Sequence, residues 1–377
     1  MTPAFARGHA EQQRKPVAHG AELLSFDVVL PPLRATSSLL CSCRSLFATP
    51  HLHRRPTSYT LLPTSMTTKR ASTREQVSQR QRVPPPGRHG GDGPRVAEAL
   101  GIDPASILDL SQNLNPFAPD VVAAAARNLD SLRRYPAPAA ATRMLAEAIG
   151  IEPDRLLLTN GGAEAVAIVA RERGGRVSSE PEFSLHPRGS HGPVWRSDPH
   201  NPSGVLAGDG ETADVWDEAF YPLATGRWSA GRSGVAVGSL TKMLACPGLR
   251  LGYVIADDVG RYSRHQPEWA VGSLGLAVLA ELLELADPPA WSRAVAEGRA
   301  ALAEAFRHEG WQVTAADAPW VLVRAPGLRE RLAREGIVVR DCTSFAMPDY
   351  VRVAVPDSRG LERLEEALSR LGKGSYS

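Results

Sequence analysis

The sequence predicts an α/β protein, and three stretches of the 377-residue chain carry that prediction. Residues 155–159 form a short apolar strand, followed by a glycine turn and the helical run AVAIVARER. Residues 233–237 form a second apolar strand, which leads into a polar stretch over 238–252. After Gly310, short apolar strands alternate with helical segments. This alternation is typical of α/β units and predicts a small α+β domain at the C-terminal end.

The remaining elements follow in chain order. A short helix is expected over 94–101, a strand over 107–110, a polar turn over 111–116, and helices over 119–129 and 140–149. Residues 176–210 are rich in proline, glycine and serine and show little regular pattern. Beyond them we expect strands over 213–218, 251–256, 313–315, 320–324, 337–340 and 350–355, and helices over 272–286, 290–309, 327–335 and 358–371.

Charge divides the chain into two parts. Residues 1–82 carry twelve lysines and arginines but four acids, and they lack sustained periodicity. We interpret them as a disordered extension, or as sequence upstream of a true start at Met66, rather than as a targeting peptide. The rest is mildly acidic, which gives no reason to expect a nucleic-acid partner. We therefore expect a large domain over 83–305, with an N-terminal arm that joins the small domain, and a small domain over 306–377.

The four cysteines and the apolar runs bound the setting. Cys41, Cys43, Cys246 and Cys342 are too scattered for a disulfide framework, and Cys41-x-Cys43 has no partner pair at zinc-like spacing. No metal site is therefore predicted. No apolar run reaches the roughly 18 residues that a membrane span needs. A reducing, cytoplasmic setting is the expectation.

One lysine stands out in residues 238–252, GSLTKMLACPGLRLG. Lys242 follows two hydroxyl residues, Ser239 and Thr241, and Arg250 comes eight positions later. A lysine amine can form a Schiff base with an aldehyde cofactor, while hydroxyls and an arginine suit a phosphate dianion. Pyridoxal phosphate carries both groups. Alone, this run would usually indicate a surface lysine after a strand, so the rest of the chain must supply a pocket.

Further motifs occur in the order that such a pocket requires. They are a glycine turn (160–164), an aromatic in Pro181-Glu-Phe183, Asn201-Pro-Ser-Gly, Asp217-Glu-Ala, and Gly-Leu-Arg250-Leu-Gly-Tyr. Over residues 88–372 the chain resembles fold-type I pyridoxal-phosphate enzymes, in the branch of histidinol-phosphate aminotransferases and the L-threonine-phosphate decarboxylases of cobalamin synthesis. The resemblance implies a large domain with a mostly parallel central sheet flanked by helices, a small α+β domain, and a homodimer.

The resemblance also assigns cofactor contacts. Lys242 would hold the cofactor covalently and later move the proton, and Asp217 would pair with the pyridine nitrogen. Asn201 would bond the 3′-oxygen. Phe183 would stack on the ring, although it could equally be an ordinary core residue, and His186 would lie just behind. The phosphate contacts would come from the amides of Gly162 and Ala163, from Ser239, Thr241 and Arg250, and across the dimer interface from Tyr135.

Two arginines in the small domain match substrate positions of the family. Arg352 would grip a substrate carboxylate as a bidentate fork, and Arg340 would make a second substrate contact. Either could instead be an exposed charge at a strand end. Asn113, Asn115 and His89 lie in segments that line the family's substrate pocket. The implied substrate is a small amino acid or amine that carries a phosphate.

The motifs favour decarboxylation over amino transfer. Phe220 follows Asp217-Glu-Ala, where the aminotransferases usually have tyrosine, and Arg340-Asp-Cys-Thr-Ser-Phe345, His89-Gly-Gly-Asp and Trp269-Ala-Val resemble the decarboxylases. We therefore expect a threonine-phosphate decarboxylase, with histidinol-phosphate amino transfer as the alternative.

One departure concerns length. Phe183 and Asn201 are 18 positions apart, and Asn201 and Asp217 are 16 apart, both shorter than is usual in the family. At least a helix and one or two strands of the large domain are expected to be missing. A third hypothesis is therefore a trimmed homologue that does not catalyse a reaction.

Overall fold

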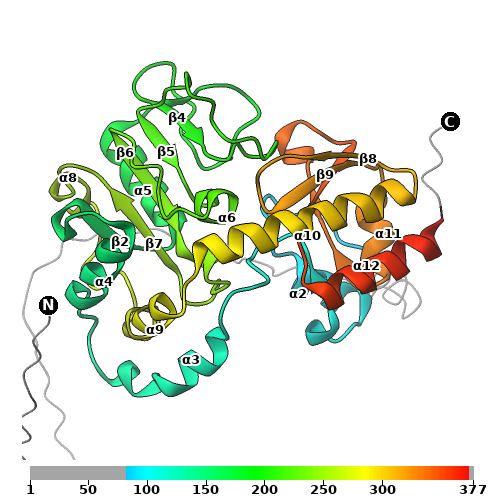
Figure 1. The fold of residues 1–377 in the computed structure, drawn as a ribbon, viewed down its shortest axis with the longest axis horizontal. Helices are drawn as coiled ribbons and strands as arrows, with labels where there is room; N and C mark the ends of the chain where they lie inside the picture. Colours follow the sequence, from blue (N-terminus) through cyan, green and yellow to red (C-terminus); the bar gives the residue numbers. More distant parts are fainter. Residues whose placement is uncertain (1–81, 373–377) are drawn as a thin grey trace, which may run out of the picture. The chain divides into compact units, whose positions relative to one another are not determined.

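The computed structural model describes residues 82–372, so the prediction for the N-terminal extension lies outside the described residues except at Arg82. Three sheets organise this part of the chain, with six, four and two strands (Figure 1). The six-stranded sheet belongs to the large lobe, and the other two belong to the small lobe. Among these residues, no helix is both long and apolar enough to cross a membrane.

The six-stranded sheet carries the core of the large lobe. Its strand order is β2-β7-β6-β5-β4-β3, and the pairs β3–β4, β4–β5 and β5–β6 are parallel. β7 is antiparallel to both of its neighbours, so the other five strands run in one direction. The sheet is therefore mostly parallel. The strands are β2 (Leu156–Asn160), β3 (Arg176–Val177), β4 (Val194–Ser197), β5 (Val215–Asp217), β6 (Val235–Ser239) and β7 (Leu251–Ile255).

Helices cover both faces of this sheet because successive strand residues point to opposite sides. On one face, α5 (Gly162–Arg173) and α8 (Gly260–Ser263) bury a cluster that includes Trp195 and Val254. The other face packs against α4 (Ala139–Ile149), α6 (Tyr221–Thr225) and α9 (Ser273–Glu284), with α3 (Val121–Arg127) beside α9. The expected helix over 119–129 is shorter, because Asp120 caps its first turn and a 3₁₀ segment, Leu129–Arg133, follows.

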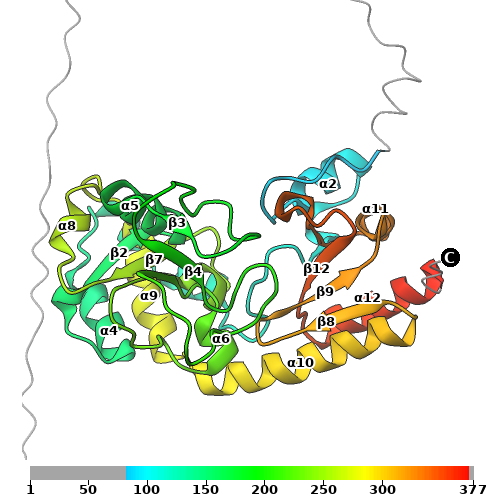
Figure 2. The same cartoon turned by 90° about the horizontal axis from the view of Figure 1, so that it is seen from above.

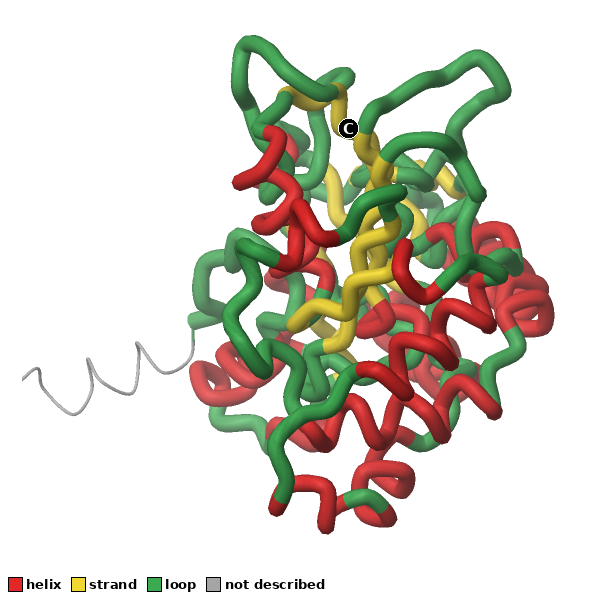
Figure 3. Tube along the Cα trace, turned by 90° about the vertical axis from the view of Figure 1, so that its left-hand side faces the viewer, coloured by secondary structure: helices red, strands yellow, loops and turns green. Residues whose placement is uncertain are grey.

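The edge of the sheet at β3 and β4 is built differently. Parallel strands usually need a helical crossover between them, yet residues 178–193 and 198–214 contain neither a helix nor a strand. These long loops lie next to β4 at the top of Figure 1. Figure 3 shows the same end of the molecule at its top, and most of it is loop. This segment is the irregular one of the sequence, and it still connects three paired strands.

The small lobe combines the C-terminal segment with the N-terminal arm (Figure 2). Its four-stranded sheet has the order β11-β12-β9-β8, and β1 of the arm pairs in parallel with β10. Leu332 and Leu364 are among the fully buried side chains that join its sheet to its helices. The strands are β1 (Leu108–Asp109), β8 (Gln312–Ala315), β9 (Trp320–Arg324), β10 (Ile337–Val338), β11 (Arg340–Asp341) and β12 (Tyr350–Ala354), and the helices are α2 (Gly93–Leu100), α11 (Leu328–Arg334) and α12 (Ser358–Leu371).

A long helix, α10 (Pro288–His308), belongs to both lobes. It packs on α6 of the large lobe and on β8, β9 and α12 of the small one (Figure 2). It begins two residues earlier than expected, because Asp287 accepts a hydrogen bond from the Ala290 amide and prolines suit the first helical positions.

Candidate active site

The carboxyl ends of the parallel strands lie together along one side of the large sheet, perpendicular to its lateral edge at β3. β2 ends beside Gly161, β5 ends at Asp217, and β6 ends at Ser239, three residues before Lys242. These strands run in the same direction, so the residues that follow them gather at the same side. A cavity of about 420 Å³ lies there, and its lining also includes Arg340 and Arg352 from the small lobe.

Lys242 lies on a single helical turn, α7 (Leu240–Met243), that directly follows β6. Its Nζ donates to the carbonyl oxygen of Gln112 at 2.7 Å. Asn115 fastens the polar turn to this helix, since its amide donates to the Lys242 carbonyl and its Nδ2 to the Met243 carbonyl, both at 2.9 Å. Burial, and then the charges of Arg352 and Arg250, lower the pKa of Lys242 to about 8. At neutral pH the amine is still mostly protonated, but its neutral, nucleophilic fraction is much larger than in an ordinary lysine.

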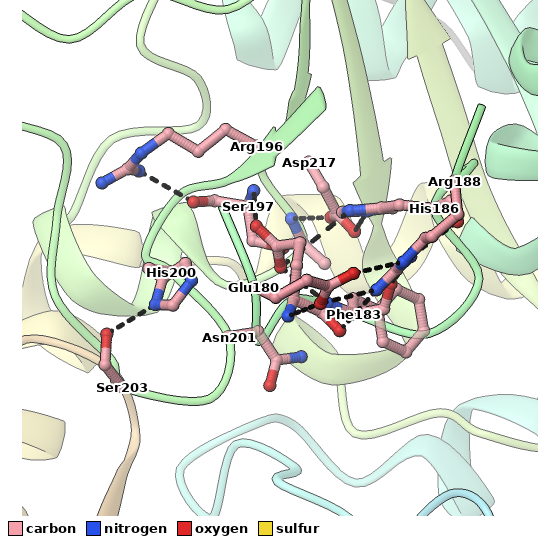
Figure 4. A network of polar contacts seen from close by, with 12 residues as sticks. Glu180, Phe183, His186, Arg188, Arg196, Ser197, His200, Asn201, Ser203 and Asp217 are labelled. Carbon is pink, nitrogen blue, oxygen red and sulfur yellow. Dashed lines mark hydrogen bonds and ion pairs between the residues drawn. The ribbon is translucent and has the colours of Figure 1, made fainter. Parts of the chain in front are cut away.

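Asp217 is a largely buried carboxylate at the end of β5. Its Oδ1 accepts from the Ala219 amide at 3.0 Å, and its Oδ2 lies 3.0 Å from Nε2 of His186 (Figure 4). A carboxylate only accepts, so Nε2 carries the proton in this contact. The side chain of His186 is fully buried. Asp217 thus faces the cavity with its orientation fixed by two donors.

Another part of the cavity lining, called the phosphate cradle below, suits an anion. Gly162, Ala163, Ser239, Thr241 and Arg250 line the same cavity. The first amides of α5 have no acceptor within their own helix, and a helix N-terminus attracts anions. The chain must be glycine where it enters α5, because Gly161 has φ 79° and a Cβ there would lie 2.5 Å from Nη2 of Arg250. Hydroxyls, amides and a guanidinium around one end of the cavity suit a phosphate dianion.

Arg352 reaches the cavity from β12 of the small lobe. Its Nη1 donates to Oδ1 of Asn201 at 2.6 Å, and its guanidinium lies 4.7 Å from the ring centre of Trp320. The Asn113 carboxamide oxygen, oriented to satisfy both groups, accepts from Nη2 and Nε at 3.0 and 3.2 Å. Burial lowers the pKa of Arg352 to about 10. The structure thus brings Asn113, Asn201 and Arg352 together.

Arg340 also lines the cavity, but its donors are already engaged. They bind the carbonyls of Gly87 and Arg88 and, at 2.7 Å, Oγ of Ser344. This arginine therefore fastens the N-terminal arm to the small lobe. The exposed strand-end charge considered for either arginine does not occur, because both side chains are buried.

The remaining predicted residues lie at different depths. Phe183 lines the cavity, 6.0 Å from the ring of His89 and edge-on to His186 at 5.5 Å. Burial and the nearby Arg340 lower the pKa of His89. Tyr135 is not among the cavity-lining residues of its own chain: 78% of it is exposed, and its ring lies 4.9 Å from that of Trp269.

Three contributors to the site escaped the sequence reasoning. The Gln112 carbonyl holds the lysine amine, and a backbone group has no residue signature. Trp320 supports Arg352 from a strand that the pattern marked only as apolar. Glu182 is buried two residues from Glu180, in the stretch without periodicity. The sequence shows an acid next to Phe183, but it does not indicate whether that acid is buried or exposed.

Comparisons with known proteins show similarity in sequence and in fold to aminotransferases. The family model "Aminotransferase class I and II" matches residues 194–371. The chain is 29% identical over 345 residues to histidinol-phosphate aminotransferase 2 of Pseudomonas fluorescens, covering 73% of this chain and 92% of that protein. Among solved structures it is similar to L-threonine-O-3-phosphate decarboxylase from Porphyromonas gingivalis and histidinol-phosphate aminotransferase from Clostridium acetobutylicum. Their identities are 20% and 19%. Both have a TM-score of 0.61 and cover 70% of this chain and 99% of theirs.

Proposed function

We infer that this chain, which belongs to the fold-type I superfamily of pyridoxal-phosphate-dependent enzymes, is an aminotransferase-like enzyme that acts on a small amine carrying an anionic group. One observation carries the inference. A single cavity holds the Lys242 amine, the Asp217 carboxylate and the Arg352 guanidinium. A nucleophile, a charge partner and an anion-binding fork are the three groups that such a reaction needs from the protein.

Pyridoxal phosphate fits the residues that are present. The cradle at the start of α5 suits its phosphate, and Asp217 faces the cavity as a partner for a protonated ring nitrogen. The chemistry that the cofactor supplies when bound is an electron sink for the breaking of a bond next to the substrate nitrogen. Lys242 would anchor the cofactor and move the proton, Asn201 would contact the 3′-oxygen, and Phe183 would lie against the ring.

We propose amino transfer of the histidinol-phosphate type as the reaction. The support comes from relatives: the aminotransferase of Pseudomonas fluorescens and that of Halorubrum lacusprofundi, at 29% and 28% identity, each match over more than nine-tenths of their length. Arg352 would turn its guanidinium to an anionic group of the substrate in exchange for its present contacts with Asn113 and Asn201. The similarity to these two aminotransferases weighs against the decarboxylase that the sequence motifs predict.

Decarboxylation of an amino-acid phosphate is the second candidate, because Phe220 favours it. The Phe220 ring meets the Trp320 ring edge-on at 4.8 Å, and the Arg352 guanidinium lies over the Trp320 ring. At the position of Phe220, the aminotransferases of the family usually have a tyrosine. Both reactions share the anchoring lysine. They differ in which bond beside the nitrogen is held perpendicular to the cofactor ring.

The test has two steps. Purified protein with added pyridoxal phosphate should show a visible absorbance band that borohydride bleaches and Lys242→Ala lacks. If the wild-type protein shows no band, the enzyme hypothesis fails and the trimmed, non-catalytic homologue replaces it. Amino transfer from histidinol phosphate to 2-oxoglutarate, measured beside CO₂ release from threonine phosphate, then separates the two reactions. Only the second would restore the cobalamin assignment.

We also propose that two copies associate. Several large apolar side chains of the large lobe are exposed, namely Val122, Leu129, Leu132, Tyr135 and Trp269, and the rings of Tyr135 and Trp269 are in contact. Exposed apolar side chains that form a contiguous patch mark interaction sites. Tyr135 would then reach the phosphate cradle of a second copy. Light scattering should give twice the mass of the chain, and Tyr135→Phe should weaken binding of pyridoxal phosphate.

A further inference from the structure

The segment that carries Phe183 and His186 has no regular structure to hold it. Residues 178–193 form the whole crossover between β3 and β4, without a helix or strand. A loop of this length ordinarily moves, since few backbone hydrogen bonds fix it. Both side chains nevertheless face the cofactor site, one in the cavity lining and one against Asp217. Something other than secondary structure must therefore fix their positions.

Arg188 fixes the shape of this loop through hydrogen bonds to its backbone. Its guanidinium collects three carbonyl oxygens of the same loop, those of Glu182 at 2.9 Å, Phe183 at 2.8 Å and His186 at 2.6 Å. Its Nε also pairs with Glu180 at 2.8 Å (Figure 4). Carbonyls that a helix would satisfy internally are thus satisfied by one planar fork. The loop is folded around this side chain.

Glu182 attaches the loop to the sheet. Its side chain is fully buried, and its carboxylate accepts from the Ser197 amide at 2.9 Å, from the Ser197 hydroxyl at 2.7 Å and from the Phe183 amide at 2.7 Å. Ser197 ends β4 and is the register partner of Asp217 on β5. Glu182 therefore ties the loop to the strand next to the one that carries Asp217.

The same carboxylate faces His186 from behind. Oε1 of Glu182 lies 3.9 Å from Nδ1 of His186, whose other nitrogen contacts Asp217 at 3.0 Å. Nδ1 is buried and makes no hydrogen bond within the described part of the chain. Two carboxylates thus flank one buried imidazole, Asp217 in contact with Nε2 and Glu182 on the Nδ1 side without a hydrogen bond to it.

We propose that Glu182 and Arg188 are positioning residues for the cofactor site. Arg188 folds the loop and Glu182 ties it to β4, and together they fix Phe183 and the His186–Asp217 contact where other chains would use a helix. The proposal rests on the pyridoxal-phosphate site and not on which reaction the site catalyses.

The test compares Glu182→Gln and Arg188→Lys with the wild-type protein. The glutamine keeps the volume but turns a donor towards Ser197, and the lysine keeps the charge but lacks the planar fork that reaches the three carbonyls and Glu180. Each should bind pyridoxal phosphate about tenfold more weakly, the size of one lost buried hydrogen bond. In the apoprotein, the ring-nitrogen NMR signals of His186, assigned with His186→Gln, should shift in Glu182→Gln.

Matched variants separate positioning from general damage. Glu98→Gln on the exposed face of α2 and Arg176→Ala on β3 should leave both readouts unchanged. Leu364→Val, in the core of the small lobe, should lower stability without moving the His186 signals. If Glu182→Gln does not fold, Ser197→Ala removes one of the same hydrogen bonds more gently.

Wild-type affinity in both loop variants, with unchanged His186 signals, would overturn the proposal. Failure of the wild-type protein to bind pyridoxal phosphate would instead overturn the proposed function. The His186 spectrum of the apoprotein tests the positioning role in either case.

Discussion

The lysine side of the cavity and its β4 side are held by different forces. On the lysine side, backbone geometry does most of the work: β6 runs into α7, β2 runs into α5, and Gly252 lies so close to Gly161 that a Cβ there would be 2.4 Å from the Gly161 carbonyl carbon. On the β4 side, buried charged side chains hold loops in place. Glu182 is one of them, and a second cluster lies on the neighbouring face of β4 and β5.

That cluster surrounds Trp216. Arg232 stacks 4.0 Å from the indole centre and pairs with the fully buried Asp198 at 2.6 Å and with Glu218 at 3.5 Å. Burial raises the pKa of Glu218. Arg196 adds an ion pair with Glu211. Paired charges in such a place hold a fixed geometry, but the loss of one member leaves another unpaired away from water.

The comparison teaches that the two sides should fail in different ways. A change on the lysine side removes chemistry and leaves the fold, because the backbone there does not depend on the side chain. A change on the β4 side should disturb stability or positioning first.

Replacement of Lys242 should abolish turnover and leave the fold intact. Lys242→Ala removes the nucleophile, and we expect a loss of roughly 10³-fold or more in kcat. Its amine makes one hydrogen bond, to the Gln112 carbonyl, so the unfolding midpoint should stay near the wild-type value. Steady-state assays and urea denaturation measure the two. A large loss of stability would mean that the lysine side is not held by backbone.

The two cavity arginines should respond unequally to the same substitution. Arg352→Lys keeps the charge but loses the fork, so KM for the anionic substrate should rise roughly 10- to 100-fold. Arg340→Lys is the matched control. The donors of Arg340 serve the N-terminal arm, so that variant should lose stability and change KM less. The opposite ranking would make Arg340 the substrate arginine.

This contrast also explains what the sequence could predict. The lysine, the glycine turn and Asp217 follow strand ends, and local pattern locates strand ends to within a residue or two. The contacts of Glu182 with Ser197 and of Arg188 with three carbonyls form inside a stretch without periodicity, where no pattern tells which charges turn inward. Arg340 matched a substrate position of the family through its local motif, and a motif cannot show that the arm occupies its donors.

Loss of Arg232 should destabilise the protein strongly. In Arg232→Met, Asp198 and Glu218 keep their burial but lose a partner, and the free energy of unfolding should fall by about 3 kcal/mol. Arg264→Met is the control, because the Arg264 side chain is 59% exposed where it pairs with Glu172. The loss in that control should be much smaller, because solvent screens an exposed ion pair. Equal losses in urea denaturation would show that the buried cluster is not special.

The smallest expected effect is a shift in the pH at which Lys242 reacts. Burial, Arg352 and Arg250 lower its pKa to about 8, and the neutral amine is the nucleophile towards an aldehyde. The rate of borohydride-trapped attachment of pyridoxal to the apoprotein should therefore rise about tenfold per pH unit below the midpoint and level off above about pH 8.

Removal of the neighbouring charge gives the sign of that shift. Arg352 disfavours the protonated amine, so Arg352→Met should move the midpoint upwards, by a few tenths of a pH unit if burial is the larger cause. The free aldehyde titrates identically in both experiments, so the difference reports the protein. Linkage has the matching sign: the folded pKa lies below that of the unfolded chain, so between about pH 8 and 10.5 the unfolded chain binds more protons and stability rises with pH. Lys242→Met should lack that rise. An unmoved midpoint in Arg352→Met would show that burial and Arg250 account for the lowered pKa, and that the two lobes are not coupled electrostatically at the lysine.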